Sequence, residues 1–202
     1  MQVSETDCRT HSRQGRTTQA IECFEQLSRG NGIQADVATY EVARLSATSG
    51  TDPLQVLSLL DRYQQRFPEG VMRGEVDWLR VQSLYRSGRH RAALSESDAL
   101  LSTSAGRVLA AEVHWLRGII FEERLLDFGR AASEFVTFVG MPGARGDEGE
   151  WRRARCLERL GRRTEATEAY RRYLERGDAR RAAEVRSKLE ELADTRRSPL
   201  SN

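Results

Sequence analysis

The sequence has almost no lysine, since Lys188 is the single one among 32 basic side chains. It also contains only 3 cysteines, 4 prolines and 3 histidines. The cysteines form no Cys-x-x-Cys pair, which excludes a disulfide framework and a four-thiolate zinc site, so buried reduced thiols are the default expectation. No apolar run approaches the ~18 residues that a membrane-spanning helix needs, and we expect no membrane span in this chain.

The first residues, Met1 to Ser12, are polar and include acidic side chains. A signal peptide would carry an apolar segment here, and a transit peptide would be rich in arginine and poor in acids. We therefore expect a cytoplasmic protein. The periplasm is the alternative if the chain is a fragment of an exported protein.

Opposite charges nearly cancel along the chain, with 32 Lys+Arg against 30 Asp+Glu and a formal net charge of +2. A nucleic-acid-binding domain would gather its basic residues on one face. Here Arg and Glu alternate, as in residues 165–176, at spacings that suit ion pairs on a solvated helix face. We therefore predict no nucleic-acid partner.

An aromatic residue begins the same short pattern four times, with further pattern residues three and six positions later. The four aromatic residues are Tyr40, Trp78, Trp115 and Trp151, separated by 38, 37 and 36 residues. A regular period of this length is typical of stacked structural repeats.

A second pattern lies between these aromatic residues at a similar period. A small or branched residue is followed by larger residues four and seven positions later, starting at Ala20, Val56, Ala93, Ala131 and Ala166. Positions i, i+4 and i+7 share one face of an α-helix, and no strand-like alternation is present. The sequence therefore predicts an all-α fold made of pairs of amphipathic helices.

Glycines separate the two predicted helices in four of the five pairs, at Gly15, Gly50, Gly88 and Gly161. We predict one repeat domain over residues 1–193 and a disordered tail over 194–202. Its five helix pairs cover residues 1–35, 36–70, 71–106, 107–143 and 144–177, and a capping helix covers 178–193.

These patterns resemble the tetratricopeptide repeat, whose unit carries W-x2-L-G-x2-Y in its first helix and A-x3-F in its second. Trp115-x2-Gly118-x2-Phe121 matches the first motif without its leucine. Ala20-x3-Phe24, Ala131-x3-Phe135 and Ala166-x3-Tyr170 match the second. The resemblance implies a right-handed α-solenoid that binds another protein or peptide on its concave face.

The segment 62–70, RYQQRFPEG, is similar to the closing sequence of repeat proteins in the bacterial cell envelope. It also resembles the repeat tails of membrane-anchored regulators. This similarity implies a role in assembling an envelope or regulatory complex.

The predicted core consists of the aromatic residues of the first pattern and the residues that recur with them. These residues are Tyr40, Trp78, Trp115, Gly118, Phe121, Trp151, Ala20, Phe24, Ala93, Ala131, Phe135, Ala166 and Tyr170.

If the aromatic residues point into the core, the positions one, five and eight residues beyond them line the inner wall of the solenoid. Apolar residues beside a column of arginines suit a peptide with carboxylate groups. The alternative is structural, because the helix dipole favours arginine near a helix carboxyl end. The predicted peptide-binding residues are Leu79, Ser83, Arg86, Leu116, Ile120, Arg124, Arg152 and Arg159.

Cys8, His11 and Cys23 form the one cluster with a metal-like composition, but their positions match core positions of the first helix pair. We therefore predict no metal site. The alternative for Cys8 and Cys23 is a disulfide between adjacent helices, which the sequence leaves open. No nucleophile with a base, no pair of catalytic carboxylates and no phosphate-binding loop is evident, so we predict no enzyme activity and no cofactor.

The sequence thus predicts a non-catalytic scaffold that binds another protein or peptide. Two alternatives stay open. An apolar face of the first helix would let the chain form a homo-oligomer, or the chain is the carboxyl-terminal part of a membrane-anchored regulator.

Overall fold

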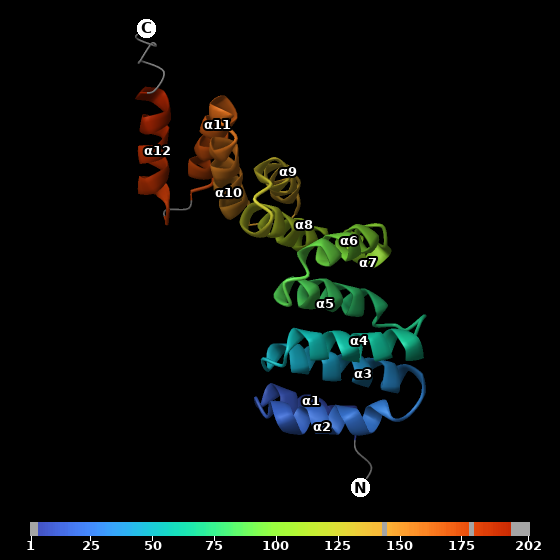
Figure 1. Cartoon of the computed structure of the whole chain (residues 1–202). Coiled ribbons are helices and arrows are strands. Elements are labelled where there is room, and N and C mark those ends of the chain that lie inside the picture. The colour runs from blue at the N-terminus through green and yellow to red at the C-terminus, as the bar shows by residue number, and fades with distance from the viewer. Residues whose placement is uncertain (1–3, 143–144, 178–179, 195–202) are drawn as a thin grey trace. The chain divides into compact units, whose positions relative to one another are not determined.

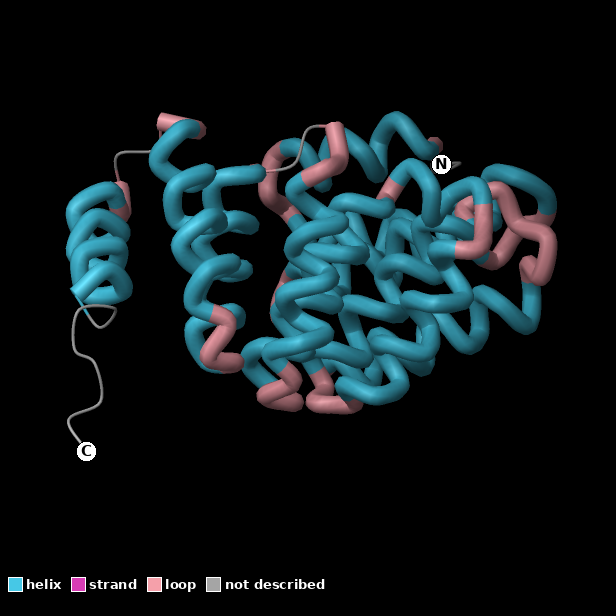
Figure 2. The backbone as a smooth tube through the Cα atoms, turned by 90° about the horizontal axis from the view of Figure 1, so that it is seen from above, coloured by secondary structure: helices cyan, strands magenta, loops and turns pink. Residues whose placement is uncertain are grey.

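The computed structural model describes residues 4–142, 145–177 and 180–194. Within these ranges every regular element is a helix, as Figure 2 shows, which confirms the predicted all-α class. The chain divides into two compact units, Met1–Gly106 (unit 1) and Arg107–Asn202 (unit 2). The sequence predicted one repeat domain over residues 1–193, whereas the structure divides between Gly106 and Arg107.

Unit 1 contains three helix pairs in which each helix packs against the next one in the chain (Figure 1). A short helix, α7 (Ser104–Val108), follows the third pair where the two units meet in the sequence. The paired helices are α1 (Glu5–Arg13) with α2 (Thr17–Ser28), α3 (Gly32–Thr48) with α4 (Pro53–Arg66), and α5 (Arg73–Arg86) with α6 (His90–Leu101).

Unit 2 contains two further pairs and a final helix. The elements are α8 (Ala110–Ile119) continued by the π-helical turn η1 (Ile120–Arg124), α9 (Phe128–Val139), α10 (Gly146–Arg159), α11 (Arg163–Glu175) and α12 (Ala182–Asp194). The last helix packs on α11, as a capping helix would. Of the predicted tail, residues 195–202 lie outside the described residues, and Asp194 ends α12.

The second helix pair begins earlier than predicted. The boundary expected at 35/36 falls inside α3, which already starts at Gly32. Gly32 has φ = +76°, a conformation that glycine adopts without steric cost. The chain therefore turns at this glycine and enters the helix at once.

The paired helices approach each other closely because small residues lie between them. Ala20, Ala93, Ala131 and Ala166, which begin the second sequence pattern, are fully buried. At Gly118 of α8 an added Cβ would lie only 2.6 Å from Cε1 of Phe135 on α9. Even an alanine at this position would have to displace the buried Phe135 ring.

Large side chains fill the space on either side of these contacts. Phe24, Phe121, Phe135 and Tyr170 are buried. The aromatic residues of the first pattern lie nearer the rim of the core, since Trp151 is buried but Tyr40, Trp78 and Trp115 are only half-buried. The Trp115 ring packs on Phe135 and Phe138, with centroid distances of 5.6 and 5.0 Å.

A buried tyrosine and a buried aspartate join the two helices of the second pair. The Tyr63 hydroxyl on α4 donates to Asp36 Oδ1 on α3 at 2.5 Å, and the backbone N–H of Val71 donates to Asp36 Oδ2 at 2.6 Å. Burial, followed by the bond to Asp36, raises the pKa of Tyr63. The Asp36 carboxylate therefore has partners on both oxygens and also fixes the loop between α4 and α5.

The first helix does not offer an apolar docking face. The one apolar side chain of α1 is Cys8, which is fully buried, and the other residues of Glu5–Arg13 are polar or charged. The apolar face expected on this helix is therefore absent, and a homo-oligomer stays a prediction without an assigned surface. Its polar outer side is suited to the end of a helix stack.

The fourth pair carries one residue more than the others between its aromatic residue and its turn. The left-handed turn residue follows the aromatic residue by ten positions at Gly50, Gly88 and Gly161, but by eleven at Leu126. The extra residue is accommodated by the π-helical turn η1, in which the Leu125 N–H donates to the Ile120 carbonyl at 3.0 Å. π-Helical hydrogen bonds occur mostly as single turns of this kind within α-helices.

Leu126 consequently adopts φ = +54°, where the other pairs have glycine. This conformation costs a non-glycine residue about 1–2 kcal/mol. We predict that Leu126→Gly raises the free energy of unfolding by about 0.5–1 kcal/mol, after the larger chain entropy of glycine is subtracted. Thermal unfolding followed by circular dichroism measures the change.

The matched control is Gly161→Leu, at the equivalent turn with φ = +71°. This variant should be less stable than the parent chain. A Leu126→Gly protein that melts at a lower temperature would contradict the strain assigned to Leu126.

Candidate interaction surface

The predicted wall residues of unit 1 do not form an open surface. Leu79 and Ser83 are buried on α5, and the Ser83 hydroxyl donates to the Leu79 carbonyl of its own helix at 2.8 Å. Arg86 is exposed, but its guanidinium donates to the Ala47 carbonyl near the end of α3 at 2.8 Å. The peptide-binding role predicted for Leu79 and Ser83 is therefore wrong, and Arg86 links two helices.

The apolar wall residues of unit 2 are also largely removed from solvent. Ile120 is fully buried and Leu116 is half-buried. Ile120 thus cannot contact a ligand on the surface, which corrects its predicted role. The reason is that a helix with neighbours on both sides buries a wider face than a simple amphipathic helix does.

Arg152 of α10 makes ion pairs with three glutamates. Its Nη1 lies 2.6 Å from Glu122 Oε2 and 3.0 Å from Glu123 Oε1, both on η1, and its Nε lies 3.4 Å from Glu148 Oε1. Its guanidinium carbon also lies 5.4 Å from the centroid of the Trp115 ring. Arg152 therefore connects η1 to α10 and has little capacity left for a ligand.

The pair between Arg152 and Glu122 is largely buried, with 17% and 8% of the side chains exposed. Burial alone would lower the pKa of Arg152, but the hydrogen bonds and charges of Glu122 and Glu123 outweigh it and raise the pKa. A charge in this position is stable only while its partner is present. The π-helical turn η1 thus carries Glu122, the acidic member of this largely buried charge pair.

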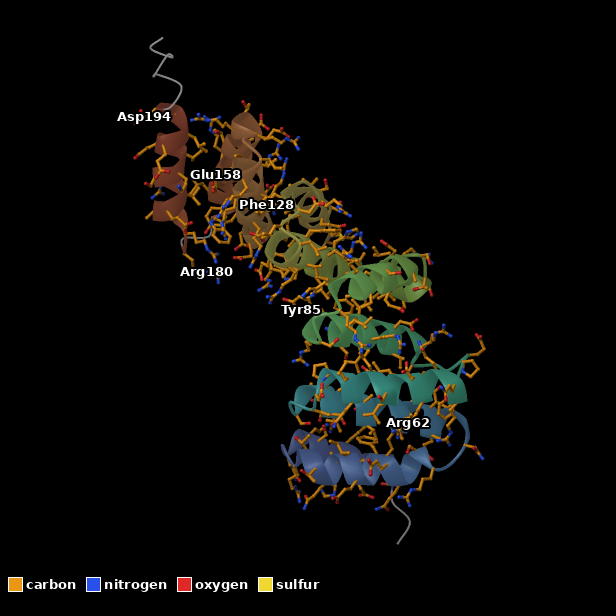
Figure 3. The ribbon with its side chains drawn as sticks, viewed as in Figure 1. Arg62, Tyr85, Phe128, Glu158, Arg180 and Asp194 are labelled. Atoms are coloured by element: carbon orange, nitrogen blue, oxygen red, sulfur yellow. A yellow bond between two sulfur atoms is a disulfide. The ribbon has the colours of Figure 1, made fainter. Side chains whose placement is uncertain are left out.

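Three exposed arginines lie on the same two elements. They are Arg124 of η1 and Arg155 and Arg159 of α10, and we call this set the η1–α10 arginine surface. Arg155 lies over the Trp151 ring at 4.6 Å and 3.8 Å from Glu122 Oε1, and Arg159 lies 5.8 Å from the centroid of Phe128. Phe128 at the start of α9 and Glu158 on α10 are labelled in Figure 3.

Arg155 was not among the residues selected from the sequence. Its position four residues after Trp151 places both side chains on one helix face, and this spacing was the available signal. Stacking on the indole ring holds the guanidinium near the helix surface while 44% of the side chain stays exposed.

A second charged cluster joins α8 to α9. The Glu134 carboxylate lies 2.6 Å from Nδ1 of His114 and 2.9 Å from Nε of Arg117. Burial would raise the pKa of Glu134, but the hydrogen bond with His114 and the charge of Arg117 lower it overall. All three side chains are mostly buried, so the cluster is a structural contact between paired helices.

The cysteines differ from the default expectation of reduced thiols. Cys8 of α1 and Cys23 of α2 form a disulfide, with their Cα atoms 5.3 Å apart. This bond uses the two thiols of the cluster considered for a metal. Cys156 is a free, buried thiol whose pKa is raised to about 12, chiefly by burial and next by the charge of Glu122. It is therefore protonated and unreactive near neutral pH.

The described part of the chain holds neither a metal-binding cluster nor a membrane-spanning helix. No group of three or more His, Cys, Asp or Glu side chains there could hold a metal ion. No helix in the same ranges is long and apolar enough to cross a membrane.

Solved structures resemble the fold over most of the chain. A crystal structure of MamA aligns with a TM-score of 0.70 at 11% sequence identity, covering 87% of this chain and 95% of that one. MamA 41-end from Desulfovibrio magneticus RS-1 gives 0.67 at 13% identity, covering 86% and 96%, and a MamA AMB-1 structure gives 0.63 at 16%, covering 84% and 94%. The chain has a tetratricopeptide-like helical fold.

The tetratricopeptide-like fold confirms the resemblance seen in the sequence motifs. No family model matches the sequence, and a comparison with curated proteins finds no match. At this level of identity the similarity to MamA concerns the fold, and function has to be argued from the residues.

The charge pair of Arg152 provides a test of its structural role. We predict that Arg152→Met lowers the free energy of unfolding by about 3 kcal/mol, because Glu122 is left buried without its closest partner. Urea unfolding followed by circular dichroism measures this change.

Arg155→Met is the control on the same helix, where the more exposed arginine should contribute below about 1 kcal/mol. If Arg152→Met is as stable as the parent chain, Arg152 is not needed for the fold and becomes a candidate for ligand binding again.

Proposed function

We propose that this chain is a non-catalytic scaffold that binds another polypeptide, and that the η1–α10 arginine surface contacts an acidic segment of that partner. The observation that carries this proposal is the exposure of Arg124, Arg155 and Arg159 on two adjoining elements of one unit. The tetratricopeptide-like fold supports a binding role, since its stacked helix pairs present extended surfaces.

The chemistry of the surface favours carboxylate groups. A guanidinium donates two parallel hydrogen bonds to a carboxylate and keeps its charge at any physiological pH. The aromatic rings beneath Arg155 and Arg159 limit the freedom of these side chains before a ligand arrives, which reduces the entropy lost on binding. An acidic peptide therefore matches the surface better than a basic or purely apolar one.

Two glutamates of η1 decide which arginines are left to contact a partner. Glu122 and Glu123 already pair with Arg152, so Arg152 is assigned to the scaffold and not to the ligand. Of the arginines predicted from the sequence, the proposal keeps Arg124 and Arg159 as ligand contacts, whereas Arg152 and Arg86 serve contacts between helices. The envelope or regulatory setting implied by residues 62–70 stays a prediction.

Binding of a fluorescein-labelled peptide with alternating Glu and Leu residues, measured by fluorescence anisotropy, tests the proposal. The triple variant Arg124→Glu, Arg155→Glu, Arg159→Glu should bind at least tenfold more weakly than the parent chain, since three favourable charge contacts become repulsive. A peptide with Lys in place of Glu should not bind to the parent chain.

The control changes the net charge equally at three exposed arginines elsewhere in unit 2: Arg171→Glu and Arg172→Glu on α11, and Arg186→Glu on α12. This control should alter affinity less than threefold. Equal losses of affinity in both triple variants would show that only the net charge of the chain matters. If the parent chain does not bind the acidic peptide, the proposed role of this surface is wrong.

A further inference from the structure

The attachment of α1 to unit 1 depends on very few contacts. Cys8 is its single buried residue, and the described side-chain hydrogen bonds and ion pairs of α1 stay within the helix itself. The Ser4–Asp7 capping box and the Arg9–Glu5 pair stabilise helix formation, but they do not hold the helix against α2. A helix of nine residues is also marginal on its own in water.

A buried nitrogen atom of α1 also opposes the packing of this helix on unit 1. Nδ1 of His11 is buried and has no hydrogen-bond partner, and burial of an unsatisfied polar atom opposes packing. In contrast, α2 contributes Ala20, Cys23 and Phe24 to a buried apolar cluster that includes Ala38, Val42 and Leu45 of α3. The α2–α3 contact therefore has an apolar core of its own, whereas α1 has almost none.

The disulfide between Cys8 and Cys23 holds α1 against α2, which the few apolar contacts of α1 do not do. It closes a loop with a sequence separation of 15, and it is the one covalent link between α1 and a neighbouring helix besides the chain itself. A cross-link over a loop of this length disfavours the open state by a factor on the order of 100.

We propose that the Cys8–Cys23 disulfide is a redox-sensitive latch that holds α1 on unit 1. A dithiol reductant breaks the S–S bond, giving two cysteine thiols, while the reductant is itself oxidised to its cyclic disulfide. After reduction α1 detaches, and α2 to α6 keep their structure because, apart from Cys8, the buried members of the apolar cluster at α2 belong to α2 and α3. Detachment uncovers the side of α2 that Cys8 now covers.

Hydrogen exchange of the full chain, read by mass spectrometry with and without dithiothreitol, tests the latch. On reduction, exchange of residues 5–13 should rise at least tenfold, while exchange in α3 and α4 should change less than twofold. Cys8→Ser with Cys23→Ser should show fast exchange of α1 in both conditions, and dithiothreitol should then have no further effect.

Three results would overturn the proposal. Alkylation of the unreduced, denatured protein could reveal free thiols at Cys8 and Cys23. The protection of α1 could be unchanged by reduction, or all of unit 1 could lose protection together with α1. The free thiol of Cys156 serves as an internal standard for complete alkylation.

Discussion

The close approach of paired helices at very small residues is the constraint on which both units depend. Ala20, Ala93, Ala131 and Ala166 are fully buried, and Gly118 lies against the ring of Phe135. Larger residues here would separate the helices and open voids around the phenylalanine and tyrosine side chains that fill the core. In four of the five pairs a buried alanine of the second helix therefore limits how closely the pair can pack, and Val56 occupies this position in the second pair.

Among the described residues, arginine takes part in many of the polar contacts between elements. Arg66 of α4 donates to the carbonyls of Ser28 and Gly30 near the end of α2, and Arg86 does the same for α3. The planar, forked guanidinium can reach two acceptors and still stack on an aromatic ring, which an ammonium group does less well. The arginines of this protein thus serve the scaffold as well as the proposed surface.

The sequence was sufficient for the helix pairs because their signal is periodic and local. The positions of Ala131 and Phe135 on one helix face follow from their spacing alone. The wall residues could not be predicted in the same way, because the burial of Leu79 and Ile120 depends on neighbouring helices on two sides. Likewise, the partners of Arg152 depend on a π-helical turn at Ile120–Arg124 that the motif does not contain.

The disulfide and the strained turn also depend on the folded structure and could not be decided from local sequence spacing. Cys8 and Cys23 meet because α1 folds back on α2, so their pairing could be named as an alternative but not decided from spacing. Leu126 replaces the expected turn glycine, and only the backbone conformation reveals that the turn was kept in spite of it.

The central claim is that in-phase small residues set the distance between paired helices. Thermal unfolding of four single variants, in which Ala20, Ala93, Ala131 or Ala166 is replaced by leucine, tests it most directly. Each variant should lose about 1–3 kcal/mol of stability through overpacking, while the exposed control Ala92→Leu should stay within about 0.5 kcal/mol of the parent chain. Buried-site variants as stable as the control would contradict this account of the fold.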